Sequence, residues 1–66
     1  MSEEMRFFIY LLENYANEKG IRGDIVYQTW KNAGIVDYIY DMYFQYHQER
    51  LENAYEDIDE KLLMAS

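Results

Sequence analysis

The chain has 66 residues, of which half are hydrophobic, and its thirteen acidic and six basic side chains give a net charge of −7 at neutral pH. A nucleic-acid binder needs a basic face to displace counterions from phosphate, so this charge balance argues against binding to DNA, RNA or an anionic membrane. Cysteine is absent, which excludes disulfides and thiolate metal sites, and eight tyrosines, three phenylalanines and one tryptophan argue against intrinsic disorder.

The first predicted helix spans about residues 3–18. Ser2 is suited to cap its start, and Gly20 is suited to the left-handed position that follows a helix. Apolar residues at helical spacing form its expected buried stripe: Met5, Phe8, Ile9, Leu12 and Ala16. Further apolar residues widen the stripe to roughly 200° of the helix: Phe7, Leu11 and Tyr15. We therefore expect this helix to be covered on more than one side.

A short second helix is predicted over about residues 24–33. Its inner edge is expected to hold Ile25 or Val26, followed by Thr29, Trp30 and Ala33. Gly34 is suited to the position that ends this helix.

A third helix is predicted over about residues 36–47. One of its faces should pack against the core and holds Ile35, Ile39, Met42 and Tyr46. Tyr40 and Phe44 point the other way, which leaves an aromatic patch with no obvious use inside a monomer of four helices.

The last helix is predicted over about residues 53–64, and residues 48–52 stay open between turn and helix. Asn53 and Glu56 have the spacing of a capping box, whereas a continuous apolar stripe through Leu51, Tyr55 and Ile58 favours an earlier start. Its outer face is expected to hold Glu56, Asp57, Asp59 and Glu60. The sequence thus predicts an all-α, compact bundle of four short helices in a single domain, 1–66. Its expected core is built on Ile9, Leu12, Trp30, Ile39 and Ile58.

No residue pattern in the chain predicts catalysis, cofactor binding or a metal centre. His47 is the only histidine and has no thiol or second imidazole to act with, so we expect a structural role at a helix end. The acidic run 56–60 lacks the glycine turn of a calcium loop, and a helix would spread its carboxylates over a solvated face. Weak divalent-cation binding remains the alternative for that run. The chain is therefore not expected to be an enzyme.

The surplus of aromatic residues can be interpreted in two ways. Tyrosines in a thin core bury their rings and leave their hydroxyls at the rim. Alternatively, Tyr40 and Phe44, with Phe7 and Leu11, form an exposed apolar patch at an interface. We favour the interface, because a chain of about 60 residues buries only roughly 60% of its surface and this first helix needs outside cover.

The order of residues resembles that of domain-of-unknown-function family 3791, a family of small bacterial proteins. Five segments carry the resemblance: Phe8-Ile9-Tyr10 with Glu13 and Tyr15, Gly20 with Gly23, 34–39, Tyr43 with His47, and 56–59. The chain departs from the family in residues 48–55, where a looser turn is expected and the sequence is compatible with helix. The resemblance implies no established activity. Family members often lie beside genes for ADP-ribosyltransferase-like proteins, which implies an accessory or neutralising role toward a neighbouring-gene protein.

These observations predict a non-catalytic protein–protein interaction module that self-associates as a homodimer or binds another protein. The alternative is a helical bundle that binds a small ligand or a divalent metal. The longest apolar run, residues 7–12, is far below the ~20 residues of a membrane span. The start of the chain is acidic where a signal peptide would be basic, so we expect a cytoplasmic protein.

Overall fold

The computed structural model describes residues 1–65, and within them it contains α-helices and no β-strand. The helices are α1 (Glu3–Lys19), α2 (Gly23–Asn32), α3 (Val36–Asp41), α4 (Tyr43–Tyr46) and α5 (Leu51–Ala65). The predicted all-α fold is confirmed. The described part of the chain has five helices where four were predicted, because the third predicted helix is divided into α3 and α4.

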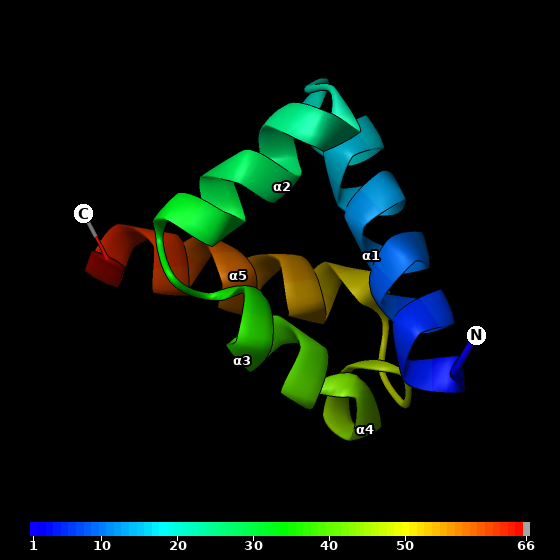
Figure 1. Ribbon diagram of the computed structural model, residues 1–66. Helices are drawn as coiled ribbons and strands as arrows, with labels where there is room; N and C mark the ends of the chain where they lie inside the picture. Colours follow the sequence, from blue (N-terminus) through cyan, green and yellow to red (C-terminus); the bar gives the residue numbers. More distant parts are fainter. Residues whose placement is uncertain (66) are drawn as a thin grey trace.

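The helices surround one core. Helices α1 and α2 form a hairpin that bends at residues 20–22, and α3 and α4 lie across its open end (Figure 1). Helix α5 runs behind the hairpin in the same view, and the two ends of the chain lie on opposite sides of the molecule. The face nearest the viewer is therefore built from α1, α2 and α3.

The ends of α1 and α2 are set by local chemistry. The Ser2 hydroxyl accepts a hydrogen bond from the backbone N–H of Met5 at 3.1 Å, so the predicted cap of α1 is confirmed. Gly20 and Gly34 have φ angles of 68° and 73°, in the left-handed region that glycine adopts without steric cost. Both glycines were predicted to end helices, and the structure confirms both.

The rotation of α1 about its axis differs from the predicted one. Phe8, Leu11, Tyr15 and Ala16 are buried, whereas Ile9 is 39% exposed and Leu12 is half-buried. The prediction of Ile9 as a core residue is therefore wrong. An apolar arc of about 200° is compatible with several rotations of the helix, and only the neighbouring helices select one of them.

The centre of the core is Trp30 of α2. Its ring lies edge-on to Phe8 and Tyr15, with centroids 5.9 Å and 5.3 Å away. Ile39 and Ile58 are also fully or almost fully buried. The core predictions for Trp30, Ile39 and Ile58 are therefore confirmed.

The break between α3 and α4 lies at Met42. Its N–H is shared by the carbonyls of Tyr38 and Ile39, both at 3.1 Å, and its ψ of 11° is outside the helical range. No glycine or proline marks this position, so the local sequence did not predict the break. Helix α5 begins at Leu51 after a turn at residues 47–50, which places Asn53 inside the helix and not at its cap.

Candidate functional site

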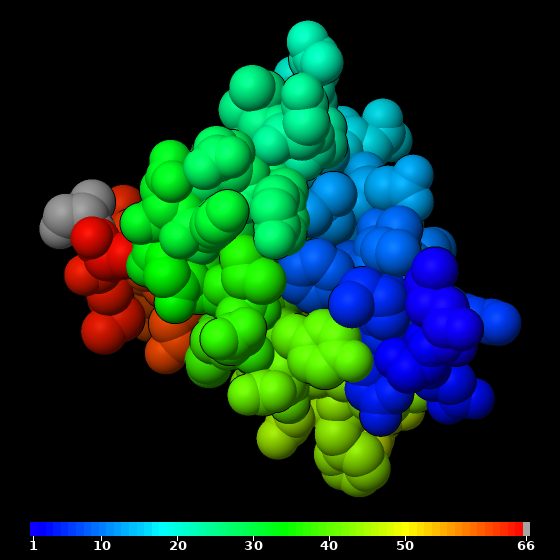
Figure 2. All heavy atoms as spheres, viewed as in Figure 1, coloured from blue at the N-terminus to red at the C-terminus, as the bar shows by residue number. Residues whose placement is uncertain are grey.

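The face formed by α1, α2 and α3 carries a shallow apolar groove. Two hollows of about 350 and 410 Å³ share Met5, Phe8 and Tyr27, so they form one continuous depression. We call it the α1–α2–α3 groove, and its lining residues are Met5, Phe8, Ile9, Leu12, Gly23, Asp24, Tyr27, Val36, Asp37 and Tyr40. Figure 2 shows the surface on which the three helices meet.

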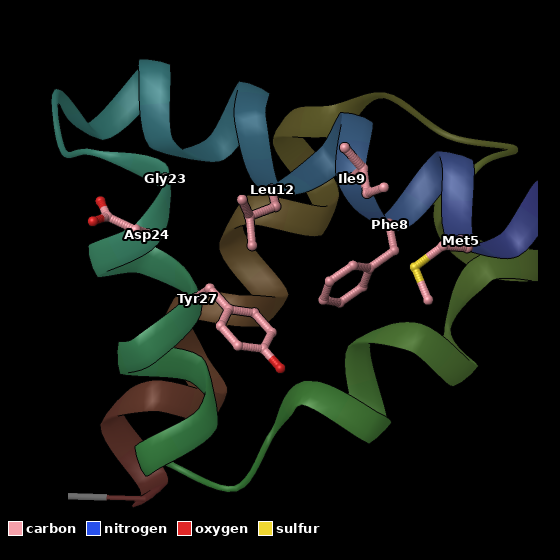
Figure 3. Close-up of a pocket in the computed structure, with 7 residues that line it drawn as sticks. All are labelled: Met5, Phe8, Ile9, Leu12, Gly23, Asp24 and Tyr27. Atoms are coloured by element: carbon pink, nitrogen blue, oxygen red, sulfur yellow. The ribbon is translucent and has the colours of Figure 1, made fainter. Parts of the chain in front are cut away.

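The groove arises because the apolar arc of α1 is wider than the core can cover. Phe8 points into the bundle, while Met5 and Ile9 lie at the edge of the arc and stay about two-fifths exposed. Tyr27 of α2 is equally exposed, and its ring points into the space in front of α1 (Figure 3). The result is a set of large apolar side chains that no part of residues 1–65 covers completely.

Gly23 of α2 lies beside Leu12 of α1 at one end of the groove. A Cβ atom built on Gly23 would lie 3.5 Å from the Cδ2 atom of Leu12, an ordinary van der Waals contact. A longer side chain at this position would therefore extend over Leu12 and into the groove. Figure 3 shows Gly23 near the start of α2, at this end of the groove.

The charged residues that line the groove, Asp24 and Asp37, are both acidic. Asp24 pairs with Arg22 at 3.0 Å, in an exposed ion pair that water screens. The adjoining hollow beside Tyr40 adds Glu4 and Asp41 to the same side of the molecule.

A second arrangement of polar residues joins α5 to α3 and α4. The Asp57 carboxylate accepts hydrogen bonds from the hydroxyls of Tyr38 at 2.6 Å and Tyr46 at 2.5 Å. Burial alone would raise the pKa of Asp57, but these hydrogen bonds and the positive charge of Lys61 hold the pKa below its usual value. Burial and the same carboxylate raise the pKa of Tyr46 above its usual value.

A similar contact joins α5 to α1. The Tyr15 hydroxyl donates a hydrogen bond to Asp59 at 2.6 Å, and the Lys19 ammonium lies 2.5 Å from the other carboxylate oxygen. Burial, followed by this hydrogen bond and the Asp59 charge, raises the pKa of Tyr15. The prediction that four acidic residues of the last helix face solvent is therefore wrong for Asp57 and Asp59, which bond to neighbouring helices. It is correct for Glu56 and Glu60, which are exposed.

His47 lies at the end of α4 in a local, structural setting. Its Nδ1 is 2.7 Å from the carbonyl oxygen of Tyr43, and its ring stacks on the Tyr43 ring with centroids 4.3 Å apart. The predicted position of His47 at a helix end is confirmed. Within residues 1–65, no group of three or more histidine, aspartate or glutamate side chains is placed to hold a metal ion.

The structure does not bring the four predicted interface residues onto one exposed patch. Leu11 is fully buried, so the prediction that it lies on an exposed surface is wrong. The wide apolar arc of α1 is compatible with several rotations of the helix, and the observed rotation turns Leu11 inward. Phe7 is half-buried against Tyr43, with ring centroids 5.6 Å apart. Tyr40 is half-buried and lines the groove, whereas Phe44 is 66% exposed.

Sequence reasoning missed most of the groove, because Ile9 and Leu12 were assigned to the core and Tyr27 was assigned to nothing. The unusual width of the α1 stripe was the signal that part of it would stay uncovered.

No helix in residues 1–65 has both the length and the apolar character that crossing a bilayer requires.

Comparison with known proteins identifies a family. A family model described as "Protein of unknown function (DUF3791)" matches residues 6–62 of the 66-residue chain. No curated protein and no solved structure matches the chain. The match includes all the segments on which the resemblance was based, as well as α2, α3, α4 and most of α1 and α5. The chain therefore belongs to the DUF3791 family of proteins of unknown function.

Proposed function

We propose that this protein is a non-catalytic interaction module and that the α1–α2–α3 groove binds a segment of a partner protein. The observation that supports this proposal is the continuous apolar lining of the groove, in which Met5, Ile9 and Tyr27 remain about two-fifths exposed. Large contiguous apolar surfaces on a small soluble domain are typical of protein-interaction sites.

The side chains around the groove favour binding over chemistry. Its lining holds no histidine, serine, threonine or lysine, and its two carboxylates are exposed. General acid–base catalysis needs a group whose pKa is shifted toward the working pH, and the pKa of Asp57, a half-buried carboxylate outside the groove, is lowered away from it. Apolar side chains with few polar groups suit the recognition of another apolar surface.

A comparative pull-down tests the proposal. The double variant Ile9→Gln/Tyr27→Gln makes two groove residues polar without changing net charge, and both positions tolerate polarity because they are partly exposed. The matched control is Leu63→Gln/Met64→Gln, which changes two exposed apolar residues near the end of α5. Each tagged protein is used to capture partners from a lysate of a bacterium that encodes it.

We expect mass spectrometry to find one or more proteins retained by the wild type and the control but lost by the groove variant. Equal retention by all three proteins would contradict the proposal. Circular dichroism of each variant would first establish that the helices are intact.

Self-association is a second candidate, supported by the exposure of Phe44. This ring lies in α4, is 66% exposed, and shares a hollow with Tyr40. Two copies that cover Phe44 would bury apolar surface that a single copy leaves in water. The predicted role toward a neighbouring-gene protein and the alternative of ligand or metal binding stay predictions.

A further inference from the structure

We infer that the segment bound in the groove is a short, basic, amphipathic helix of a different protein. This inference rests on the proposed function and specifies the chemistry of the partner. It follows from the apolar floor of the groove, the sign of the charges along it, and the size of the molecule.

The floor predicts an apolar face on the partner. Met5, Ile9 and Leu12 lie on one side of α1 at spacings of four and three residues, and Tyr27 faces them from α2 (Figure 3). Side chains arranged along one helix in this way match a second helix whose apolar residues recur every three to four positions.

The charges predict a basic flank on the partner. Asp24 and Asp37 line the groove, and Glu4 and Asp41 line the hollow that adjoins it. Within residues 1–65 neither Asp37 nor Asp41 forms an ion pair. Lys31 lies in a neighbouring hollow that shares Val36 and Asp37 with the groove, and Arg22 pairs with Asp24, so the four acids outnumber these two bases.

The local excess of acid agrees with the charge of the whole chain, −7. A protein field of this sign attracts lysine and arginine and accelerates association with a basic segment. An acidic partner would be repelled by the same groups. Electrostatic complementarity therefore selects a basic partner.

The same charges argue against a second copy of this chain in the groove. Two grooves placed face to face would bring the acidic side chains of both copies, Asp24 and Asp37, close together. Like charges opposed across an interface oppose association. A second copy of this chain is therefore a poor match for the groove.

The size of the molecule limits the length of the bound helix. The principal extents are 29, 22 and 20 Å, so a helix lying across the face contacts the protein over about 20 Å. At about 1.5 Å per residue this corresponds to roughly 13 to 15 residues, or about four turns.

Three synthetic peptides of about 15 residues test the inference. All three carry leucine at the same helical spacing, and their flanking positions are lysine in the first, glutamine in the second and glutamate in the third. Isothermal titration calorimetry gives each dissociation constant at low and high salt. Amide chemical shifts of the isotope-labelled protein show where each peptide binds.

Two double variants separate local from global charge. Asp24→Asn/Asp37→Asn removes the acids that line the groove, and Glu49→Gln/Glu56→Gln removes two exposed acids that do not line it. Both variants change the net charge from −7 to −5, because each replaces two acids by amides.

We expect the lysine peptide to bind best and to shift the amides of α1, α2 and α3. The groove variant should weaken its binding by about fivefold, and less so at high salt, whereas the control variant should change it little. Equal or tighter binding of the glutamine or glutamate peptide in the groove would overturn the basic-partner inference but leave the proposed function standing. If none of the peptides shifts groove residues, both the inference and the proposed function are contradicted.

Discussion

Replacing Asp57 by alanine should destabilise the fold far more than replacing an exposed acidic residue of α5. The carboxylate accepts hydrogen bonds from Tyr46, which is only 3% exposed, and from Tyr38, which is half-buried. A buried hydroxyl left without an acceptor costs about 1–3 kcal/mol, while the Tyr38 hydroxyl can turn to water. We therefore expect Asp57→Ala to lower the free energy of unfolding by about 2 kcal/mol.

That loss is large for a domain of this size. Native domains are stabilised by roughly 0.05–0.15 kcal/mol per residue, which suggests about 5 kcal/mol in total here. A loss of about 2 kcal/mol corresponds to a fall in Tm of roughly 8–16 °C in so small a protein. Urea and thermal unfolding followed by circular dichroism would measure both quantities.

A double-mutant cycle tests whether the effect of Asp57 acts through Tyr46. In the Tyr46→Phe background no buried hydroxyl depends on the carboxylate, so Asp57→Ala should cost clearly less than in the wild type. The matched control is Glu56→Ala, the exposed neighbour, which should change stability by no more than about 0.5 kcal/mol. Equal unfolding midpoints for Asp57→Ala and Glu56→Ala would refute the reasoning.

The pH dependence gives an independent check on Asp57. Because its pKa is lower in the folded protein than in the unfolded chain, its charge stabilises the fold at pH values above the unfolded pKa of about 4. This contribution disappears as the pH falls through the folded pKa. The stability difference between the wild type and Asp57→Ala should therefore narrow in acid.

Four further predictions test the core, the tyrosines, the oligomeric state and metal binding. Ile39→Ala should cost about 2–5 kcal/mol in urea unfolding, since Ile39 is 2% exposed, whereas the surface change Glu60→Ala should stay within about 0.5 kcal/mol. Because the pKa of Tyr46 is raised in the fold, the free energy of unfolding should fall as the pH rises above about 10. This fall should be less steep in Tyr46→Phe, and equal pH dependence of unfolding in the two proteins would contradict the prediction. Sedimentation at tens of micromolar protein should show a species of twice the 8.1 kDa chain mass. The double variant Tyr40→Ala/Phe44→Ala should weaken this association, and a clean monomer of the wild type would exclude the homodimer. Millimolar calcium, magnesium or zinc should leave the Tm unchanged relative to EDTA, because no group of three or more acidic or histidine side chains in residues 1–65 is placed to hold a metal ion. A tight site would instead add about 2.7 kcal/mol of stability at 100 times its Kd, which a rise in Tm would reveal.

The sequence alone determined the features that depend on neighbouring residues along the chain. The all-α fold follows from helical spacing of apolar residues, and the ends of α1 and α2 follow from Ser2, Gly20 and Gly34. Trp30 was predicted correctly as a core residue because its spacing of four residues from Val26 and three from Ala33 places its large apolar ring on one face of α2.

Only the tertiary structure decided how the wide apolar arc of α1 is divided between core and surface. Both Leu11 and Ile9 are compatible with burial when the helix is considered alone, yet Leu11 is buried and Ile9 remains exposed in the groove. The inward position of Asp57 likewise depends on residues distant in sequence, Tyr38 and Tyr46. Local spacing specifies which side chains share a helix face, but which face is covered depends on the packing of the other helices.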